Sequence, residues 1–216
     1  EEELQRQLLK RRDAYVNAAM ALSERRIAAA KKFEKEIEAN LKAVALEKAR
    51  FRVDIQRRNE DENSFTSRGF DRVAYFFSAN VGEEPKPLTK VASGGEASRL
   101  TLILKTTAKL KDIRKAVVFD EVDAGIGGRV AQAVGQKLKE LAKNQQVLCV
   151  THQPQVASQA DHHFVVMKSM TKNQTSISVY ELADQERIEE VARMLAGEKV
   201  TDAARENARE MIATSF

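Results

Sequence analysis

The stretch that decides the fold is KAVVFDEVDAGIGG, residues 115–128. In it a short apolar run ends in two adjacent carboxylates, Asp120 and Glu121, and a third, Asp123, follows before a glycine-rich turn. Short apolar runs bounded by turn signals predict buried strands. Because an unpaired buried charge is very costly, a strand that ends in paired acids indicates a metal ion, a proton to be moved, or both. In open α/β sheets ligands bind outside the carboxyl ends of strands, so we expect a site here.

The composition limits the partners and the compartment. The chain has 216 residues, a net charge of +4 and a single cysteine, Cys149. The mildly basic balance allows nucleic acid or another polyanion as a partner but does not demand it. A single cysteine excludes an internal disulfide, which suits the reducing cytoplasm. No apolar run approaches the roughly 20 residues that span a bilayer, so we expect a cytoplasmic protein with no membrane partner.

Residues 1–62 are expected to form a helical arm. They contain no Gly and no Pro, and good helix formers dominate them. Apolar residues recur at three- and four-residue steps, roughly the heptad spacing of a coiled coil. The repeat consists of Tyr15, Ala18, Leu22, Phe33, Ile37, Leu41, Val44, Phe51 and Ile55. A continuous helix would extend roughly 90 Å and could not bury its stripe alone, so we expect the returning arm of a coiled coil. The chain begins without Met within this pattern, and we expect it to be part of a longer protein.

Residues 63–216 are expected to form an α/β domain with a mostly parallel sheet and flanking helices. Strand–helix–strand alternation is typical of that arrangement. The predicted strands are residues 70–78, 117–119, 147–151 and 164–168, and the predicted helices are residues 96–111 and 128–141. Residues 175–182 are the expected hairpin partner of residues 164–168, with a turn at Lys172 and Asn173. The tail, residues 184–215, is expected to hold two helices separated near Gly197, the second capped by Thr201.

Four signals that bear chemistry follow one another in a fixed order. The first is Ser93-Gly94-Gly95-Glu96 at the start of a helix. Glycines let the backbone approach a ligand, and the free N–H groups of a helix N-terminus favour an anion. Such a stretch alone is a weak signal, because a flexible helix start has the same composition.

The other three signals are acidic residues and a histidine. Asp120 is suited to hold Mg²⁺, usually through water, and Glu121 is suited to orient or deprotonate an attacking water. Asp123 lies in the turn beyond this pair, where the start of the next helix also favours acids. His152 follows the apolar strand QVLCVT directly and is well placed for a γ-phosphate if the two strands are adjacent. His162 and His163 are assigned no role.

This order of motifs resembles the C-terminal lobe of an ABC-type ATPase head. In that family SGGE is the signature motif, VVFDE the Walker B strand, VDAG the D-loop and TH the switch histidine. The helical arm narrows the resemblance to the SMC-like branch, in which a coiled coil interrupts the head. The segments that match DNA-repair members of this branch are residues 88–99, 117–138, 146–161 and 192–212. Departures are small: Ala97, Ala124 and Gln153 stand where a larger apolar residue, Thr and Leu are usual.

The resemblance implies roles for the motif residues. Two heads would enclose two molecules of ATP with Mg²⁺, and the implied partners are a second head, the N-terminal lobe of the same protein and DNA. The resemblance also implies a location at the nucleoid. Asp120 would coordinate Mg²⁺ through water, Glu121 would act on the hydrolytic water, and His152 would contact the γ-phosphate. Asp123 would reach across the dimer. The residues that would meet the nucleotide held by the opposite subunit are Ser93, Gly94, Gly95 and Glu96.

One motif is absent from the 216 residues: the phosphate loop G-x-x-x-x-G-K-[ST]. The family places it in the N-terminal lobe, so we expect this chain to carry half of an ATPase site and to hydrolyse ATP negligibly by itself. Two alternatives stay open. The chain is a DNA-tethering or coiled-coil module with idle ATPase residues, or the head of another SMC-like chromosome-maintenance protein. The tail ARMLAGEKVTDAARENA, residues 192–208, weighs against the second alternative.

Overall fold

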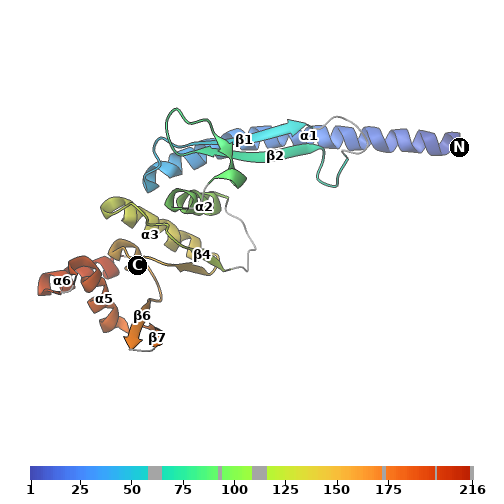
Figure 1. The fold of residues 1–216 in the computed structure, drawn as a ribbon. Helices are drawn as coiled ribbons and strands as arrows, with labels where there is room; N and C mark the ends of the chain where they lie inside the picture. The colour runs from blue at the N-terminus through green and yellow to red at the C-terminus, as the bar shows by residue number, and fades with distance from the viewer. Residues whose placement is uncertain (58–64, 92–93, 109–115, 172–173, 198, 215–216) are drawn as a thin grey trace. The chain divides into compact units, whose positions relative to one another are not determined.

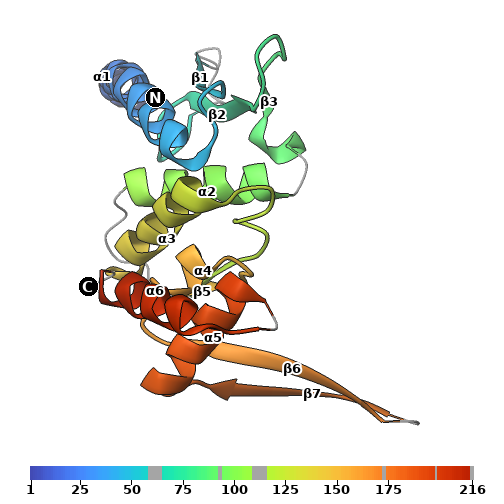
Figure 2. The same ribbon diagram turned by 90° about the vertical axis from the view of Figure 1, so that its left-hand side faces the viewer.

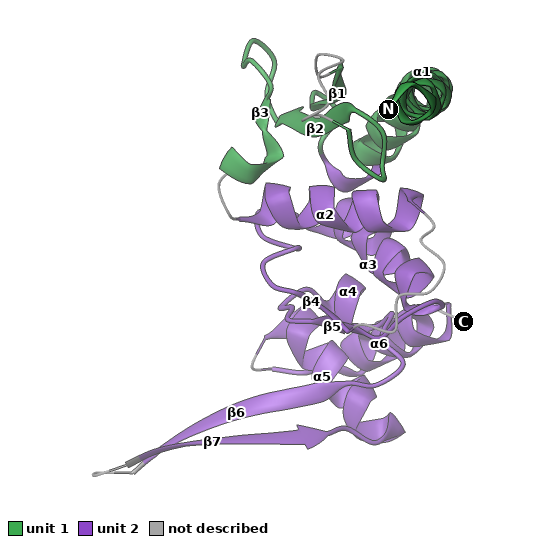
Figure 3. Cartoon of the chain, turned by 90° about the vertical axis from the view of Figure 1, so that its right-hand side faces the viewer, with its two compact units in different colours: residues 1–42, 46–92 green, residues 43–45, 93–216 purple. Residues whose placement is uncertain are grey.

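The computed structural model describes residues 1–57, 65–91, 94–108, 116–171, 174–197 and 199–214. The chain divides into two compact units (Figures 1 and 3). Unit 1 consists of residues 1–42 and 46–92, and unit 2 consists of residues 43–45 and 93–216. The boundary that the sequence predicts after Glu62 lies outside the described residues and stays a prediction.

Unit 1 contains one long helix and a small antiparallel sheet. The helix α1 (Glu2–Leu41) has 40 residues and is followed by the 3-10 turn η1 (Lys42–Val44). The three-stranded sheet has the order β1-β2-β3, and all its pairs are antiparallel. Its strands are β1 (Arg50–Arg57), β2 (Asp71–Ser78) and β3 (Lys86–Pro87), and the 3-10 turn η3 (Leu88–Lys90) follows. The predicted strand at residues 70–78 is confirmed.

The helix predicted over residues 1–62 ends at Leu41, so the prediction is wrong for residues 42–57, while residues 58–62 lie outside the described residues. Ala45 has a φ of 58°, which is incompatible with a continuing helix. From Arg50 to Gln56 polar and apolar side chains alternate, RFRVDIQ, and this is the period of a strand. Phe51 and Ile55 mislead because they are four residues apart, a spacing that fits both a helix and one face of a strand. Phe51 packs edge-on against Phe33 of α1, with 5.9 Å between the ring centroids.

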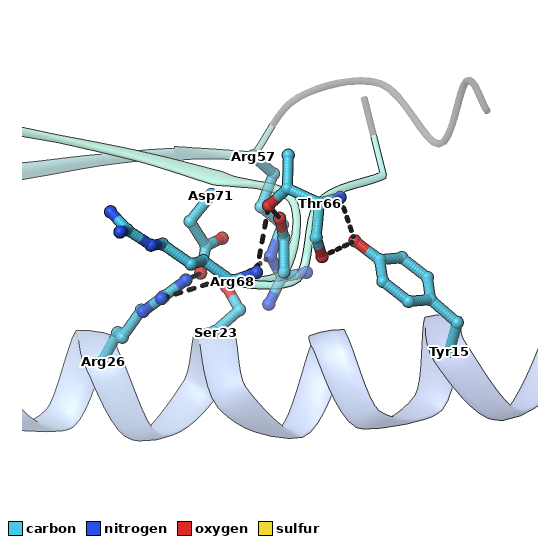
Figure 4. A network of polar contacts seen from close by, with 8 residues as sticks. Tyr15, Ser23, Arg26, Arg57, Thr66, Arg68 and Asp71 are labelled. Atoms are coloured by element: carbon cyan, nitrogen blue, oxygen red, sulfur yellow. Dashed lines mark hydrogen bonds and ion pairs between the residues drawn. The ribbon is translucent and has the colours of Figure 1, made fainter. Parts of the chain in front are cut away.

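Polar contacts hold the β1–β2 hairpin against α1. The Tyr15 hydroxyl accepts a hydrogen bond from the Thr66 N–H (3.0 Å) and donates one to the Thr66 carbonyl (3.2 Å) (Figure 4). Arg26 donates to the Asp71 carboxylate at 3.0 Å, and Arg57 donates to the Ser23 hydroxyl at 3.1 Å. Two glutamates of α1 also accept from backbone N–H groups of β1, which satisfies part of an open sheet edge.

The centre of unit 2 is a parallel pair of strands packed against helices. The strands β4 (Val117–Phe119) and β5 (Val147–Cys149) pair in register, Val117 with Val147, which confirms the parallel pair predicted from the sequence. The helices are α2 (Gly95–Thr107), α3 (Gly128–Ala142) and the short α4 (Pro154–Ala157). α3 packs against α2, α4 and β5. The buried residues here include Phe119, Val122, Val134 and Val156.

The prediction of a mostly parallel sheet is not borne out. In the described residues the sheets are small, and only β4 and β5 are parallel. Residues 164–168 do not extend this sheet but belong to a separate hairpin. Alternate residues on one face of the parallel pair are exposed, Val118 at 66% and Leu148 at 47%, whereas sheets of this kind normally have both faces covered.

The rest of unit 2 is a hairpin followed by two helices. β6 (Phe164–Thr171) and β7 (Gln174–Glu181) are antiparallel and project away from the helices (Figure 2), as predicted, although the predicted turn at residues 172–173 lies outside the described residues. α5 (Asp184–Ala196) and α6 (Asp202–Ala213) pack together around Val191, Ala192 and Ala208. Thr201 caps α6 as predicted, accepting from the Ala204 N–H at 3.2 Å. Across the described part of the chain, no helix is both long and apolar enough to cross a bilayer.

Candidate functional site

The acids form a tight turn directly after β4, here called the acid turn, residues 120–124. Glu121 has a φ of 57°, a left-handed conformation that is uncommon for a residue other than glycine. The Ala124 N–H donates to the Glu121 carbonyl at 3.0 Å and closes the turn. Val122 is fully buried, whereas Asp120 and Glu121 are exposed. Both carboxylates are therefore free to meet a ligand, and the strained residue is the one expected to act on water.

The acid turn is tied on one side to α2. The Ser98 hydroxyl donates to the Asp120 carbonyl at 2.9 Å, and the Arg99 guanidinium donates to the Ala124 carbonyl at 3.0 Å. Arg99 is only 5% exposed, and burial lowers its pKa, an effect that the nearby charge of Glu96 opposes. A Cβ at Gly95 would lie 3.0 Å from the Glu121 carbonyl oxygen, so this approach requires a glycine. Gly94, Gly95 and the acids are thus brought together, while Ser93 lies outside the described residues.

On the other side the acid turn meets the end of β5. Oδ2 of Asp123 accepts hydrogen bonds from the Thr151 hydroxyl and from the His152 N–H, the latter at 3.1 Å. Nδ1 of His152 lies 3.5 Å from the same oxygen, and its ring is 73% exposed. The expectation that the histidine follows a strand adjacent to the acid-tipped strand is confirmed by the β4–β5 pairing.

Asp123 makes its described contacts within its own chain, and the role across a dimer that the resemblance implies stays a prediction. Its side chain is only 2% exposed, and its carboxylate is engaged by Thr151 and His152 of its own chain. To reach across a dimer, the carboxylate would have to leave these hydrogen bonds, and the donors would lose their partner. In this structure Asp123 joins the acid turn to the histidine.

The exposed acids are compatible with Mg²⁺ but do not form a cage for it. The described residues include no group of three or more His, Cys, Asp or Glu side chains that could hold a metal ion. Mg²⁺ keeps several waters and is commonly held by one or two carboxylates together with substrate phosphates. Asp120 fits that kind of site, in which the phosphates supply the remaining ligands.

Three residues that build the site were not predicted from the sequence: Ser98, Arg99 and Thr151. The burial of Arg99 could have been predicted from the sequence. Arg99 precedes Leu102 by three positions and Ile103 by four, so it lies on the apolar side of α2. A cation in such a stripe indicates a buried polar partner. Ser98 and Thr151 had no such signal, since a hydroxyl near a helix start or a strand end is common.

Comparison with known proteins identifies close relatives, although no protein-family model matches the chain. The DNA repair protein RecN of Rickettsia bellii is 41% identical over 210 residues, which are 97% of this chain and 38% of that protein. RecN of Halalkalibacterium halodurans is 41% identical over 202 residues, 94% of this chain and 36% of that protein. RecN of Bacillus subtilis is 38% identical over 212 residues, 93% of this chain and 37% of that protein. The chain thus spans less than two fifths of the length of these relatives.

The solved structures that the comparison finds include Smc head domains, with TM-scores below 0.5. One, with a coiled coil and joint, is derived from Pyrococcus yayanosii; it has a TM-score of 0.49 and 20% identity over 77% of this chain and 29% of that one. Another, from Pyrococcus furiosus, has a TM-score of 0.45 and 17% identity over 76% of this chain and 36% of that one. The assignment rests on the sequence relatives: the chain is a homologue, over nearly its whole length, of part of the DNA repair protein RecN.

Proposed function

We propose that this chain is the C-terminal lobe and part of the coiled-coil arm of an SMC-like ATPase head that acts on broken DNA in recombinational repair. The observation that carries the proposal is the arrangement around the acid turn. The acid turn is hydrogen-bonded to α2, which begins with glycine, on one side and to the loop that carries His152 on the other. The relatives that match nearly the whole chain are DNA repair proteins, which supports the biological role.

The residues of this chain would divide the work of ATP hydrolysis. Mg²⁺, when bound, neutralises charge on the phosphates, and Asp120 would hold it through water. Glu121 would orient and deprotonate the attacking water. His152 would contact the γ-phosphate of the nucleotide in its own head. The glycines at the start of α2 would offer backbone N–H groups to the nucleotide held by a second head.

The proposal requires two further parts, the N-terminal lobe of the same protein and a second head. The sequence contains no phosphate loop, so the N-terminal lobe must supply it. The exposed apolar face of the parallel strands, which includes Val118, Leu148 and Val150, supports additional chain over this surface. A second head would complete each nucleotide site, and the arm would couple the engagement of the heads to DNA.

The test is ATP hydrolysis by this chain and by the full-length protein. We expect negligible activity from the chain alone and activity from the full-length protein. In the full-length protein, Glu121→Gln should reduce kcat by about 100-fold or more, the range for loss of a general base. Glu140→Gln on α3 is the matched control, because Glu140 is exposed and pairs only with Lys137 in the described structure. Appreciable hydrolysis by the chain alone, abolished by Glu121→Gln, would contradict the proposal of a half-site.

A second candidate function is DNA tethering without ATPase activity. The observation that favours it is a basic sheet: Arg50 and Arg52 of β1 and Arg72 of β2 are exposed, and the Arg52 guanidinium lies 5.0 Å from the centre of the Phe76 ring. Such side chains suit phosphate contacts, which weaken as salt increases. Salt-dependent DNA binding that Glu121→Gln does not affect, together with absent ATPase activity in the full-length protein, would favour tethering.

A further inference from the structure

Asp123 is a buried carboxylate that accepts hydrogen bonds from Thr151 and His152. An ionised carboxylate is costly to bury unless hydrogen bonds compensate it. Oδ2 receives the Thr151 hydroxyl and the His152 N–H, and the His152 ring lies beside it. Thr151 and His152 are consecutive residues that follow β5, so Asp123 contacts both the backbone and the side chains of one loop.

Thr151 makes the loop a fixed turn. Its hydroxyl accepts a hydrogen bond from the Gln153 N–H at 3.0 Å, and a backbone N–H can only donate. A hydroxyl has one proton, and the carboxylate of Asp123 can only accept it. The direction of both bonds is therefore determined: Gln153 donates to Thr151, and Thr151 donates to Asp123. These two hydrogen bonds hold residues 151–153 to the acid turn.

The His152 ring has little else to orient it. It is 73% exposed, and its other described polar neighbour is the Gln153 side chain, 3.3 Å from Nε2. On the far side α4 begins at once with the buried Pro154. The ring is thus carried by a short backbone segment that Asp123 holds at one end and α4 at the other.

We propose that Asp123 and Thr151 are positioning residues that hold His152 in place within the same chain. The proposal deepens the proposed function and rests on it where it concerns ATP. It assigns a role to Thr151 and gives Asp123 a partner in its own head instead of in the opposite head. Neither residue needs to touch the nucleotide.

The first test measures the loop without using ATPase activity. In the full-length protein, Asp123→Asn and Thr151→Val should each speed hydrogen exchange at the His152 amide, because its carboxylate acceptor is weakened or displaced. Exchange in α5 and α6 should stay unchanged. Asp202→Asn, an exposed residue at the start of α6, is the control. Unchanged exchange at His152 in both variants would overturn the proposal.

The second test separates positioning from nucleotide binding. We expect each variant to lower kcat by about 10- to 100-fold, the effect of misplacing a catalytic group slightly. KM for ATP should change less than about twofold, since the residues do not touch the nucleotide. Thr151→Ser keeps the hydroxyl and should restore kcat, and the double variant should be no worse than either single one. A rise in KM at constant kcat, additive losses or no rescue would count against positioning.

The third test distinguishes one chain from two. Mixed dimers are prepared with Asp123→Asn and Thr151→Val either in the same subunit or in separate subunits. If the contact is within a chain, the same-subunit dimer keeps one intact site and is the more active. If it crosses the dimer, the separate-subunit arrangement is the more active, and the proposal fails. Absence of ATPase activity in the wild-type full-length protein would refute the proposed function, while the exchange measurement still decides the contact.

Discussion

Gly135 is the residue at which α3 comes closest to α4. A Cβ at this position would lie 2.8 Å from Cγ of Gln159, 3.0 Å from the Gln155 carbonyl oxygen and 3.3 Å from Cα of Val156. The Gln159 side chain can move, but the other two atoms are backbone. A glycine inside a helix normally lowers its stability by about 1 kcal/mol relative to alanine. Here glycine is needed because α3 and α4 approach each other too closely for any side chain at residue 135.

We expect Gly135→Ala to destabilise the chain despite the better helix propensity of alanine. Overpacking of this kind lowers the free energy of unfolding by about 1–3 kcal/mol. Urea unfolding should show a lower midpoint at an unchanged slope. Gly127→Ala is the control, because Gly127 has an extended φ of −163° and the nearest atom to an added Cβ lies 4.0 Å away. An equal loss in both variants would show that crowding against α4 is not the cause.

Cys149 gives a second prediction for a single residue. Burial, with the nearby charges of Asp123 and Asp120, raises the pKa of its thiol to about 12 from an ordinary value of 9.0. Because the thiolate is the reactive form, alkylation by iodoacetamide near neutral pH should be at least about tenfold slower in the folded chain than in urea. The chain has no other cysteine, so mass spectrometry reports this site alone. Equal rates in the folded and unfolded chain would contradict the burial of the thiol.

Among the elements, the β1–β2 hairpin depends on α1 for its position. A hairpin of two long strands is marginal in water without a packing partner. The Asp71 side chain is fully buried and pairs with Arg26, whose side chain is 28% exposed. Tyr15, farther along α1, fixes the loop before β2 through both backbone groups of Thr66 (Figure 4). The helix thus holds the hairpin at several points along its length.

Asp71→Ala should therefore loosen the hairpin. The loss of a hydrogen-bonded charge partner leaves Arg26 half-satisfied, and we expect a fall in unfolding free energy of about 1.5–3 kcal/mol. Glu83→Ala removes an exposed ion pair with Lys86 from the same unit and is expected to change stability by less than about 1 kcal/mol. Thermal or urea unfolding of the variants measures both. A similar fall in unfolding free energy in the two variants would contradict a larger contribution from the Arg26–Asp71 pair.

At the scale of the molecule, unit 2 is joined by a line of contacts from α2 to α5. Ser98 and Arg99 hold the acid turn, Asp123 holds the histidine loop, and α4 follows that loop. The Arg187 guanidinium of α5 donates to the Ser158 carbonyl at 2.7 Å and the Ala160 carbonyl at 2.5 Å, at the end of α4. The site is therefore held by α2 on one side and, through the residues after α4, by α5 on the other.

The same junction makes folding sensitive to pH through His163. Burial and the charge of Arg187 lower the pKa of this imidazole, while Glu190 opposes the change. The unfolded chain therefore binds the proton more readily. The stabilising contribution is fully present above the ordinary histidine value of about 6.5, and it is lost as the pH falls through the folded pKa.

We accordingly expect the unfolding free energy to fall with pH below neutrality and to fall less in His163→Gln. Urea unfolding at a series of pH values measures the difference in slope. His162→Gln is the control, since His162 is exposed and paired with Glu181. A pH dependence that is identical in the wild type and His163→Gln would contradict this account.

Much of unit 2 could be predicted because its signals are local. The helices and strands follow from hydrophobic periodicity, and the hairpin and the Thr201 cap follow from turn and cap chemistry. The error at residues 42–57 has an equally local cause, because the spacing of Phe51 and Ile55 fits both a helix and one face of a strand. The limited size of the sheets could not be foreseen, since strand pairing depends on segments distant in the sequence.

The sequence by itself determined which chemical groups are present and in what order: glycines before a helix, acids after one strand and a histidine after the next. It also determined the absence of a phosphate loop and the homology to RecN. Only the tertiary structure decided where Asp123 points, which residues hold the acid turn and where the arm stops being helical. The reason is physical: a carboxylate becomes buried, exposed or paired according to neighbours that the fold brings close, and Thr151 and Arg99 are 28 and 25 residues away from the groups they bind.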